Sequence, residues 1–163
     1  MKEQIFQIVE DALNEHKRAE LKHVILGIIQ TESSFRPEAG RFEPDYKWLV
    51  KPKHYAKQNG ITVDTEIVFQ KTSWGLMQVM GAVYRELGYP GALNMLSCDI
   101  EKQIRYGIRH FLRMFAFYGD INRAILGYNR GFGVKHDDVK LALLDRESYL
   151  NKVLRHSEQF IEV

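Results

Sequence analysis

The sequence has little that could cross-link or anchor the chain. It contains a single cysteine, Cys98, so no internal disulfide can form and the fold cannot depend on an oxidising compartment. No apolar run is long enough to span a bilayer, and the N-terminal segment alternates charged with apolar residues where a signal peptide has a continuous apolar stretch. We therefore expect a protein synthesised in the cytoplasm without a signal peptide and with no stable membrane insertion.

The chain also lacks an excess of charge of either sign. It has 23 Lys and Arg against 21 Asp and Glu, a net charge of +2, whereas nucleic-acid binders usually concentrate basic residues on one face. Apolar residues make up 45% and charged residues 27%, which is the composition of a globular protein. With no internal repeat and no low-complexity linker, we expect one catalytic domain over residues 1–163, a monomer with no nucleic-acid partner.

Several common kinds of active site have no support. The six histidines show no metal-ligand spacing, so no metal site is expected. Ser33 and Ser34 lack the flanking glycines of a nucleophile elbow, and the glycines at 127, 131 and 133 do not follow a strand, as a phosphate-binding loop requires. We expect no cofactor.

What the sequence does contain is helical periodicity, with apolar residues three and four apart over most of its length. Prolines and Gly60 interrupt residues 36–72, Asp64 and Asp120 are expected helix caps, and Gly88 ends a helix. The fold class is all-α, with a small irregular or short-strand insertion in 36–72. The predicted helices cover residues 5–13, 21–32, 52–60, 64–69, 72–88 after an initial turn, 99–118, 120–128, 135–144 and 146–161.

One carboxylate lies where an anion is disfavoured. Glu32 follows Ile28 by four residues on the apolar face of the second helix, near the C-terminus, where the helix dipole is negative. That field and its neighbours Ile28, Ile29 and Phe35 should raise the pKa of Glu32, which suits a general acid near neutral pH. The alternative is an ordinary surface glutamate at a helix end.

Three short motifs then resemble, in order, those of the soluble lytic transglycosylases, a lysozyme-like family. They are TESSF (31–35) followed by Pro37, SWGLMQVM (73–80) and ILGYNRG (125–131). The resemblance implies a goose-type-lysozyme-like domain that cleaves peptidoglycan between N-acetylmuramic acid and N-acetylglucosamine with no cofactor. Together with the missing signal peptide, it predicts an enzyme of the phage endolysin type or one carried by a virion, acting on the cell wall after release.

The resemblance also implies roles for individual residues. Glu32 becomes the catalytic acid and then base, and the Tyr128 hydroxyl lies near its carboxyl or near the acetamido group of the substrate. Because the 6-hydroxyl of the muramic acid closes a 1,6-anhydro ring, no water enters and no second carboxylate is needed, unlike in ordinary glycosidases.

Five further positions are carried over as the substrate-binding set. Ser33 supports the loop of the first motif, Met77 packs along the sugar groove and Gln78 hydrogen-bonds within it. Trp74 is the first choice for stacking on a sugar face, as an aromatic residue inside the second motif. Asn129 braces the site from behind.

The chain departs from the family pattern in two places. Glu32 of its first motif and Gly75 of its second lie 43 residues apart, and the inserted carboxylates include Glu43 and Glu66. Glu43 is the best candidate for a second carboxylate, which would make the enzyme a water-using muramidase if the carboxyl groups lie roughly 6.5–9.5 Å apart. The alternative is that Glu43 pairs with an arginine or caps a turn.

The second departure is in the third motif, where Gly127 and Arg130 replace the two alanines of the family. Arg130 either binds a peptide-stem carboxylate beside the groove or points to solvent. A function of another class, a non-catalytic wall-binding module, also fits the sequence.

Overall fold

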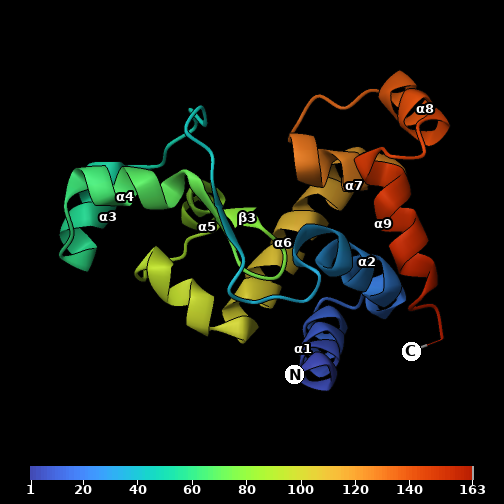
Figure 1. Cartoon of the computed structure of the whole chain (residues 1–163), viewed down its shortest axis with the longest axis horizontal. Helices are drawn as coiled ribbons and strands as arrows, with labels where there is room; N and C mark the ends of the chain where they lie inside the picture. Colours follow the sequence, from blue (N-terminus) through green and yellow to red (C-terminus); the bar gives the residue numbers. More distant parts are fainter. Residues whose placement is uncertain (163) are drawn as a thin grey trace.

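A computed structural model describes residues 1–162 of the chain. It is mostly helical with one small sheet, so the predicted all-α class with a short-strand insertion is confirmed (Figure 1). The helices are α1 (Lys2–Glu15), α2 (Lys22–Ser33), α3 (Pro52–Asn59), α4 (Val63–Gln70), α5 (Gly81–Glu86), α6 (Ile100–Tyr118), α7 (Ile121–Arg130), α8 (His136–Leu144) and α9 (Tyr149–Glu158), with 3₁₀ turns η1 (Ala19–Leu21) and η2 (Leu93–Cys98).

Local chemistry explains most helix ends. The Asp120 carboxylate accepts a hydrogen bond from the Arg123 backbone N–H and caps α7, as predicted, and Gly60 ends α3 in the left-handed conformation. The prediction that Asp64 caps α4 is wrong, because the Thr62 side chain accepts from the Thr65 N–H.

The second motif is a β-hairpin and not the first half of a helix. Strands β2 (Thr72–Trp74) and β3 (Val79–Met80) pair antiparallel, and β1 (Gly40–Phe42) pairs antiparallel with the other edge of β2. The turn between β2 and β3 needs positive φ at Gly75 (73°) and Gln78 (47°), which a helix cannot accommodate. The predicted helix over 72–88 therefore exists only as α5.

The longest helix, α6, crosses the middle of the molecule (Figure 1). On one side of it lie α3, α4, α5 and the sheet, and on the other lie α1, α2, α7, α8 and α9. The stripe of α6 that the sequence predicted is buried, with Ile104, Ile108 and Phe111 fully inaccessible in the core. The helix thus connects the two halves whose facing sides carry the three motifs.

Helices α2 and α9 approach each other very closely at Gly27. A Cβ atom at this position would lie 2.2 Å from the Ser157 Oγ and 2.9 Å from both the Ser157 nitrogen and the Val153 oxygen. Only a glycine permits this distance, and the packing fixes the position of the C-terminal end of α2, where Glu32 lies.

Candidate active site

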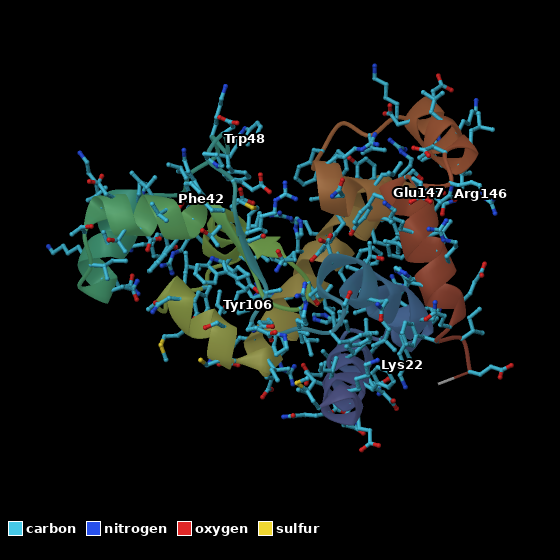
Figure 2. The ribbon with its side chains drawn as sticks, in the orientation of Figure 1. Lys22, Phe42, Trp48, Tyr106, Arg146 and Glu147 are labelled. Carbon is cyan, nitrogen blue, oxygen red and sulfur yellow. The ribbon has the colours of Figure 1, made fainter. Side chains whose placement is uncertain are left out.

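The three motifs line one open cavity of about 730 Å³ between the two halves of the molecule. Its wall includes the end of α2, the segment after β1, the β2–β3 hairpin, α6 and the end of α7. Charged and polar lining residues are Glu32, Arg41, Glu43, Tyr46, Ser73, Gln78, Glu86, His110, Arg113, Tyr128, Asn129 and Arg130. Aromatic rings lie at its edges, including Phe132 and the exposed Trp48, whose position at the tip of the 43–51 loop Figure 2 shows.

Glu32 faces this cavity from the last turn of α2. Its Oε1 accepts a 2.7 Å hydrogen bond from the Tyr149 hydroxyl, and its Oε2 has no hydrogen-bond partner within residues 1–162. Burial raises the pKa of Glu32 to about 7, and the hydrogen bond from Tyr149 acts in the opposite direction. Near neutral pH the group can therefore hold a proton and can also lose it.

The surroundings of Glu32 differ in one respect from the prediction. Ile28 and Ile29 are buried beneath it, but Phe35 turns away and packs its ring against Phe6 and Phe160 on another side of α2. The left-handed conformation of Ser34, with φ 52°, reverses the chain at this point and separates Phe35 from Glu32.

Sequence reasoning missed Tyr149. It is the first residue of α9 and lies 117 positions from Glu32, outside all three motifs. Only the close α2–α9 packing brings its hydroxyl to the carboxyl group. The sequence signal was an aromatic residue following the helix cap Ser148, which by itself indicates packing and not catalysis.

The Tyr128 hydroxyl makes no hydrogen bond to the Glu32 carboxyl, and its predicted place near that carboxyl or near the acetamido group of the substrate stays a prediction. Its ring lines the cavity, but its hydroxyl is buried and donates a 2.6 Å hydrogen bond to the Met77 carbonyl. Burial raises the pKa of Tyr128 well above its usual value, so the phenol stays protonated. Tyr128 joins α7 to the hairpin of the second motif.

Ser33 and Met77 hold the site from within the core. The Ser33 Oγ contacts the Leu76 carbonyl at 2.8 Å and the Ile29 carbonyl at 3.2 Å, which links the first motif to the second. Met77 is 0% exposed, with its sulfur packed against Gly107 of α6. The structure thus contradicts substrate contacts for both residues, while Ser33 does support the segment that carries Glu32.

Gln78 does line the cavity, but its side-chain amide is engaged in the hairpin. Its Nε2 donates to the Ala39 and Gly75 carbonyls, and its Oε1 accepts from the Ser73 hydroxyl. These bonds stabilise the positive φ of Gln78. A hydrogen bond to a sugar can use only the remaining lone pair of Oε1.

Trp74 is not among the residues that line the cavity. Its indole N–H donates to the Phe69 carbonyl and its ring packs edge-on against the Phe69 ring, so the expected sugar stacking is contradicted. The wall instead takes its aromatic side chains from Tyr128 of α7, from Tyr46 and Trp48 of the insertion and from Phe132 after α7.

The remaining carried-over positions do lie on the wall. Asn129 is exposed to the cavity, so it does not brace the site from behind, and its contact with substrate stays a prediction. Glu43 lines the same cavity as Glu32, and its Oε1 pairs with the Arg41 Nε at 2.8 Å. The predicted pairing with an arginine therefore occurs, and a role for Glu43 as a second carboxylate stays a prediction. Glu66, by contrast, is fully buried in an ion pair with Arg85.

His110 is the other titratable group that could transfer a proton here. Burial, followed by the nearby Arg113 charge, lowers the pKa of His110 to about 4. Its Nδ1 lies 3.1 Å from an Arg113 guanidinium nitrogen, which can only donate. His110 is therefore neutral near pH 7, and Glu32 is the better proton donor.

Residues 1–162 contain no group of three or more His, Cys, Asp and Glu side chains that could hold a metal ion. In the same part of the chain, no helix combines the length and the apolar character needed to cross a membrane.

A comparison with protein families identifies this arrangement. A family model described as "Transglycosylase SLT domain" matches residues 12–150, which include all three motifs, Glu32 and Tyr149. The chain belongs to the transglycosylase SLT domain family. No curated protein and no solved structure gives a significant match.

Membership of the transglycosylase SLT domain family confirms the resemblance seen in the motifs, and with it a lysozyme-like fold. It supports an enzyme of the lytic transglycosylase type that acts on peptidoglycan. The matched range also contains the 36–72 insertion, so the segment that carries Glu43, Tyr46 and Trp48 lies within the domain.

Proposed function

We propose that the protein cleaves the β-1,4 bond between N-acetylmuramic acid and N-acetylglucosamine and leaves a 1,6-anhydro ring on the muramic acid. The observation that carries this proposal is the placement of Glu32. It is a largely buried carboxyl group with a pKa of about 7 that lines an open cavity and accepts a hydrogen bond from Tyr149 through one oxygen.

The reaction then needs one carboxyl group in two steps. The proton of Glu32 passes to the bridging oxygen as the bond from that oxygen to C1 of the muramic acid breaks, and the acetamido oxygen stabilises the cation at C1. The Glu32 carboxylate next takes the proton of the 6-hydroxyl while that oxygen bonds to C1. Glu32 is protonated again at the end, so no water is consumed and protons balance.

Tyr149 fits the second step. While Glu32 is ionised, the phenol donates to a charged acceptor, and such hydrogen bonds are stronger than those to a neutral carboxyl. Burial raises the pKa of Tyr149 well above its usual value, so the phenol remains a donor throughout. We infer that the hydrogen bond from Tyr149 allows Glu32 to ionise near neutral pH although the carboxyl group is largely buried.

Product analysis tests the proposal directly. Digested cell-wall sacculi should release fragments that end in anhydro-muramic acid, which weigh one water less than the hydrolysis product. Mass spectrometry distinguishes the two. Fragments with reducing muramic acid ends and no anhydro ends would overturn the proposal.

One observation favours a second candidate, a water-using muramidase. Glu43 and Glu86 line the same cavity as Glu32, so carboxylates that could activate water are present. Each, however, is paired with a cavity arginine, Glu43 with Arg41 and Glu86 with Arg113. If Glu43 is the base, its replacement by glutamine should abolish a product with reducing ends. In the transglycosylase the same change leaves the product anhydro.

The variant Glu32→Gln distinguishes the transglycosylase and the muramidase, which both need this carboxyl group, from a non-catalytic wall-binding module. Removing a general acid lowers the rate by roughly 10²–10⁴, and the glutamine side chain keeps the size and polarity needed for binding. We expect the rate at which purified sacculi are lysed to decrease by a factor in that range, while co-sedimentation with sacculi persists. A loss of only a few fold would contradict the catalytic role of Glu32. That the enzyme is of the phage endolysin type stays a prediction.

A further inference from the structure

Three arginines line the cavity, and they differ in whether a carboxylate neutralises them. Arg41 pairs with Glu43 at 2.8 Å and Arg113 pairs with Glu86 at 3.0 Å. Arg130 has no carboxylate oxygen within 4 Å among residues 1–162 and makes no side-chain hydrogen bond to them. The cavity therefore presents one guanidinium that a ligand anion can reach without displacing a protein partner.

The position of Arg130 relates it to a second hollow. It is the last residue of α7, and it lines both the main cavity and a smaller hollow of about 240 Å³ between the end of α7 and α8. The other residues that line the hollow are Asp138, Leu141, Ala142, Asp145 and Ser148. Arg130 is thus the one residue that both linings share.

The hollow has a charge pattern of its own. Asp138 accepts the Lys135 N–H with one oxygen, at 2.7 Å, and Asp145 accepts the Glu147 N–H with one oxygen, at 2.9 Å. Neither second oxygen has a hydrogen-bond partner within residues 1–162. One guanidinium and two carboxylates on the lining match a ligand that carries both an anion and an ammonium group.

The peptide stem of peptidoglycan has this chemistry, since it carries free carboxylates and a diamino acid and is attached to the muramic acid. We propose that Arg130 and the 240 Å³ hollow form a subsite for the peptide stem, in which Arg130 pairs with a stem carboxylate and the hollow receives the part of the stem beyond it. This inference rests on the proposed function. It makes stem-bearing glycan, and not bare glycan or a neutral amino-sugar polymer, the preferred substrate.

The test compares two substrates. Intact sacculi carry stems, and sacculi treated with an amidase that releases the stems carry only glycan. For the wild-type protein the initial cleavage rate should be higher on intact sacculi than on stem-free sacculi. Arg130→Ala should lower the ratio of the two rates by about tenfold, the size expected for a partly exposed charge-assisted hydrogen bond. Arg130→Lys keeps the charge without the planar fork and should retain part of the ratio.

Arg146→Ala is the matched control. It removes the same charge from the neighbouring α8–α9 connection, where Figure 2 shows Arg146, but Arg146 lines neither cavity. Its rate ratio should equal that of the wild type. An unchanged ratio in Arg130→Ala overturns the subsite, as does an equal loss on both substrates, which would make Arg130 a glycan contact.

Binding without turnover separates this inference from the proposed function. In the Glu32→Gln background, Arg130→Ala should weaken co-sedimentation with intact sacculi and leave co-sedimentation with stem-free glycan at the level of Glu32→Gln alone. If the wild type cleaves neither substrate, the proposed function fails while this comparison still decides the subsite. If Glu32→Gln alone and Glu32→Gln with Arg130→Ala bind intact sacculi equally, the subsite is overturned.

Discussion

Ionising Glu32 inside the cavity has a free-energy cost, and the pH dependence of folding measures it. The pKa of this carboxyl is about 7 in the folded protein and about 4.5 in an unfolded chain. Its contribution to stability is therefore fully present below pH 4.5 and is lost as the pH rises through 7. The total is about 3 kcal/mol at 1.36 kcal/mol per pKa unit.

Glu32→Gln removes this ionisation. We expect the variant to gain stability relative to the wild type by about 2–3 kcal/mol between about pH 4 and about pH 8.5, measured by urea unfolding. Glu3→Gln, at an exposed carboxyl of α1, is the control and should show no such trend. A difference between Glu32→Gln and wild type that is constant with pH would mean that Glu32 is not buried as described.

Replacing Tyr149 tests its effect on the same carboxyl. The phenol donates to Oε1 and favours the ionised form, so Tyr149→Phe should raise the pKa of Glu32 further. The alkaline limb of the kcat/KM profile should move to higher pH, because the general acid stays protonated longer. Tyr128→Phe removes a hydroxyl that bonds the Met77 carbonyl and should leave that limb in place, whatever its effect on rate. The same shift in both variants would count against a direct role for Tyr149.

The sequence predicted Glu32 because two independent properties coincide there, an apolar helix face and a family motif. It could not predict Tyr149, whose contact depends on the packing of two helices 117 residues apart. It also misassigned Met77 and Trp74. Motif positions do not reveal which side chains of a hairpin face the cavity, and both of these pack inward or against Phe69.

At the scale of elements, the α2–α9 contact should be sensitive to a single methyl group. Gly27→Ala places a Cβ 2.2 Å from the Ser157 Oγ and 2.9 Å from backbone atoms, which cannot rotate away. Overpacking typically costs about 1–3 kcal/mol, and the better helix propensity of alanine offsets no more than about 1 kcal/mol. We expect a net loss of about 1–2 kcal/mol and reduced activity, because the shift separates Tyr149 from Glu32.

Denaturant unfolding measures the loss, and Gly40→Ala is a suitable control. A Cβ at Gly40 meets nothing closer than 3.5 Å, and its backbone does not have positive φ. Its stability should stay within about 0.5 kcal/mol of the wild type, as for most surface changes. Equal effects of the two alanine variants would show that α2 and α9 can separate at no cost.

Helix periodicity predicted the elements that pack through a continuous apolar stripe, which is why α6 and α7 match so closely. The hairpin of residues 72–80 was not predicted because its strands are too short to show an alternation of apolar and polar residues. Its turn also places a glutamine, Gln78, at a φ that favours glycine, and only hydrogen bonds to Ser73, Ala39 and Gly75 make this conformation stable.

For the whole molecule, contacts between distant segments determine how the two halves meet, and no periodicity encodes them. Gln103 of α6 shows this. Its buried amide accepts from the Leu76 N–H and donates to the Pro37 and Leu96 carbonyls, so one side chain joins the segments after the first motif, within the second and after α5. From the sequence, Gln103 was merely a polar residue in a helix.

The half that contains α3, α4 and α5 depends on a buried charge pair. Arg85 and Glu66 form two hydrogen bonds of 2.8 and 2.9 Å at 0% exposure, and Arg85 also donates to the Tyr89 and Gly91 carbonyls. Arg85→Met leaves the Glu66 carboxylate buried without its partner. We expect a loss of about 3–5 kcal/mol in the free energy of unfolding at neutral pH.

The double variant decides what this pair contributes. Arg85→Met with Glu66→Leu replaces both charges by apolar groups, so it should recover much of the loss, since buried pairs gain little over well-packed apolar residues. Lys140→Ala, which breaks the exposed pair with Asp137, should change stability by less than about 1 kcal/mol. Because α5 also carries Glu86 to the cavity wall, activity in this series should follow stability. A double variant no more stable than Arg85→Met would show that the carbonyls of Tyr89 and Gly91, and not the charge of Glu66, make Arg85 indispensable.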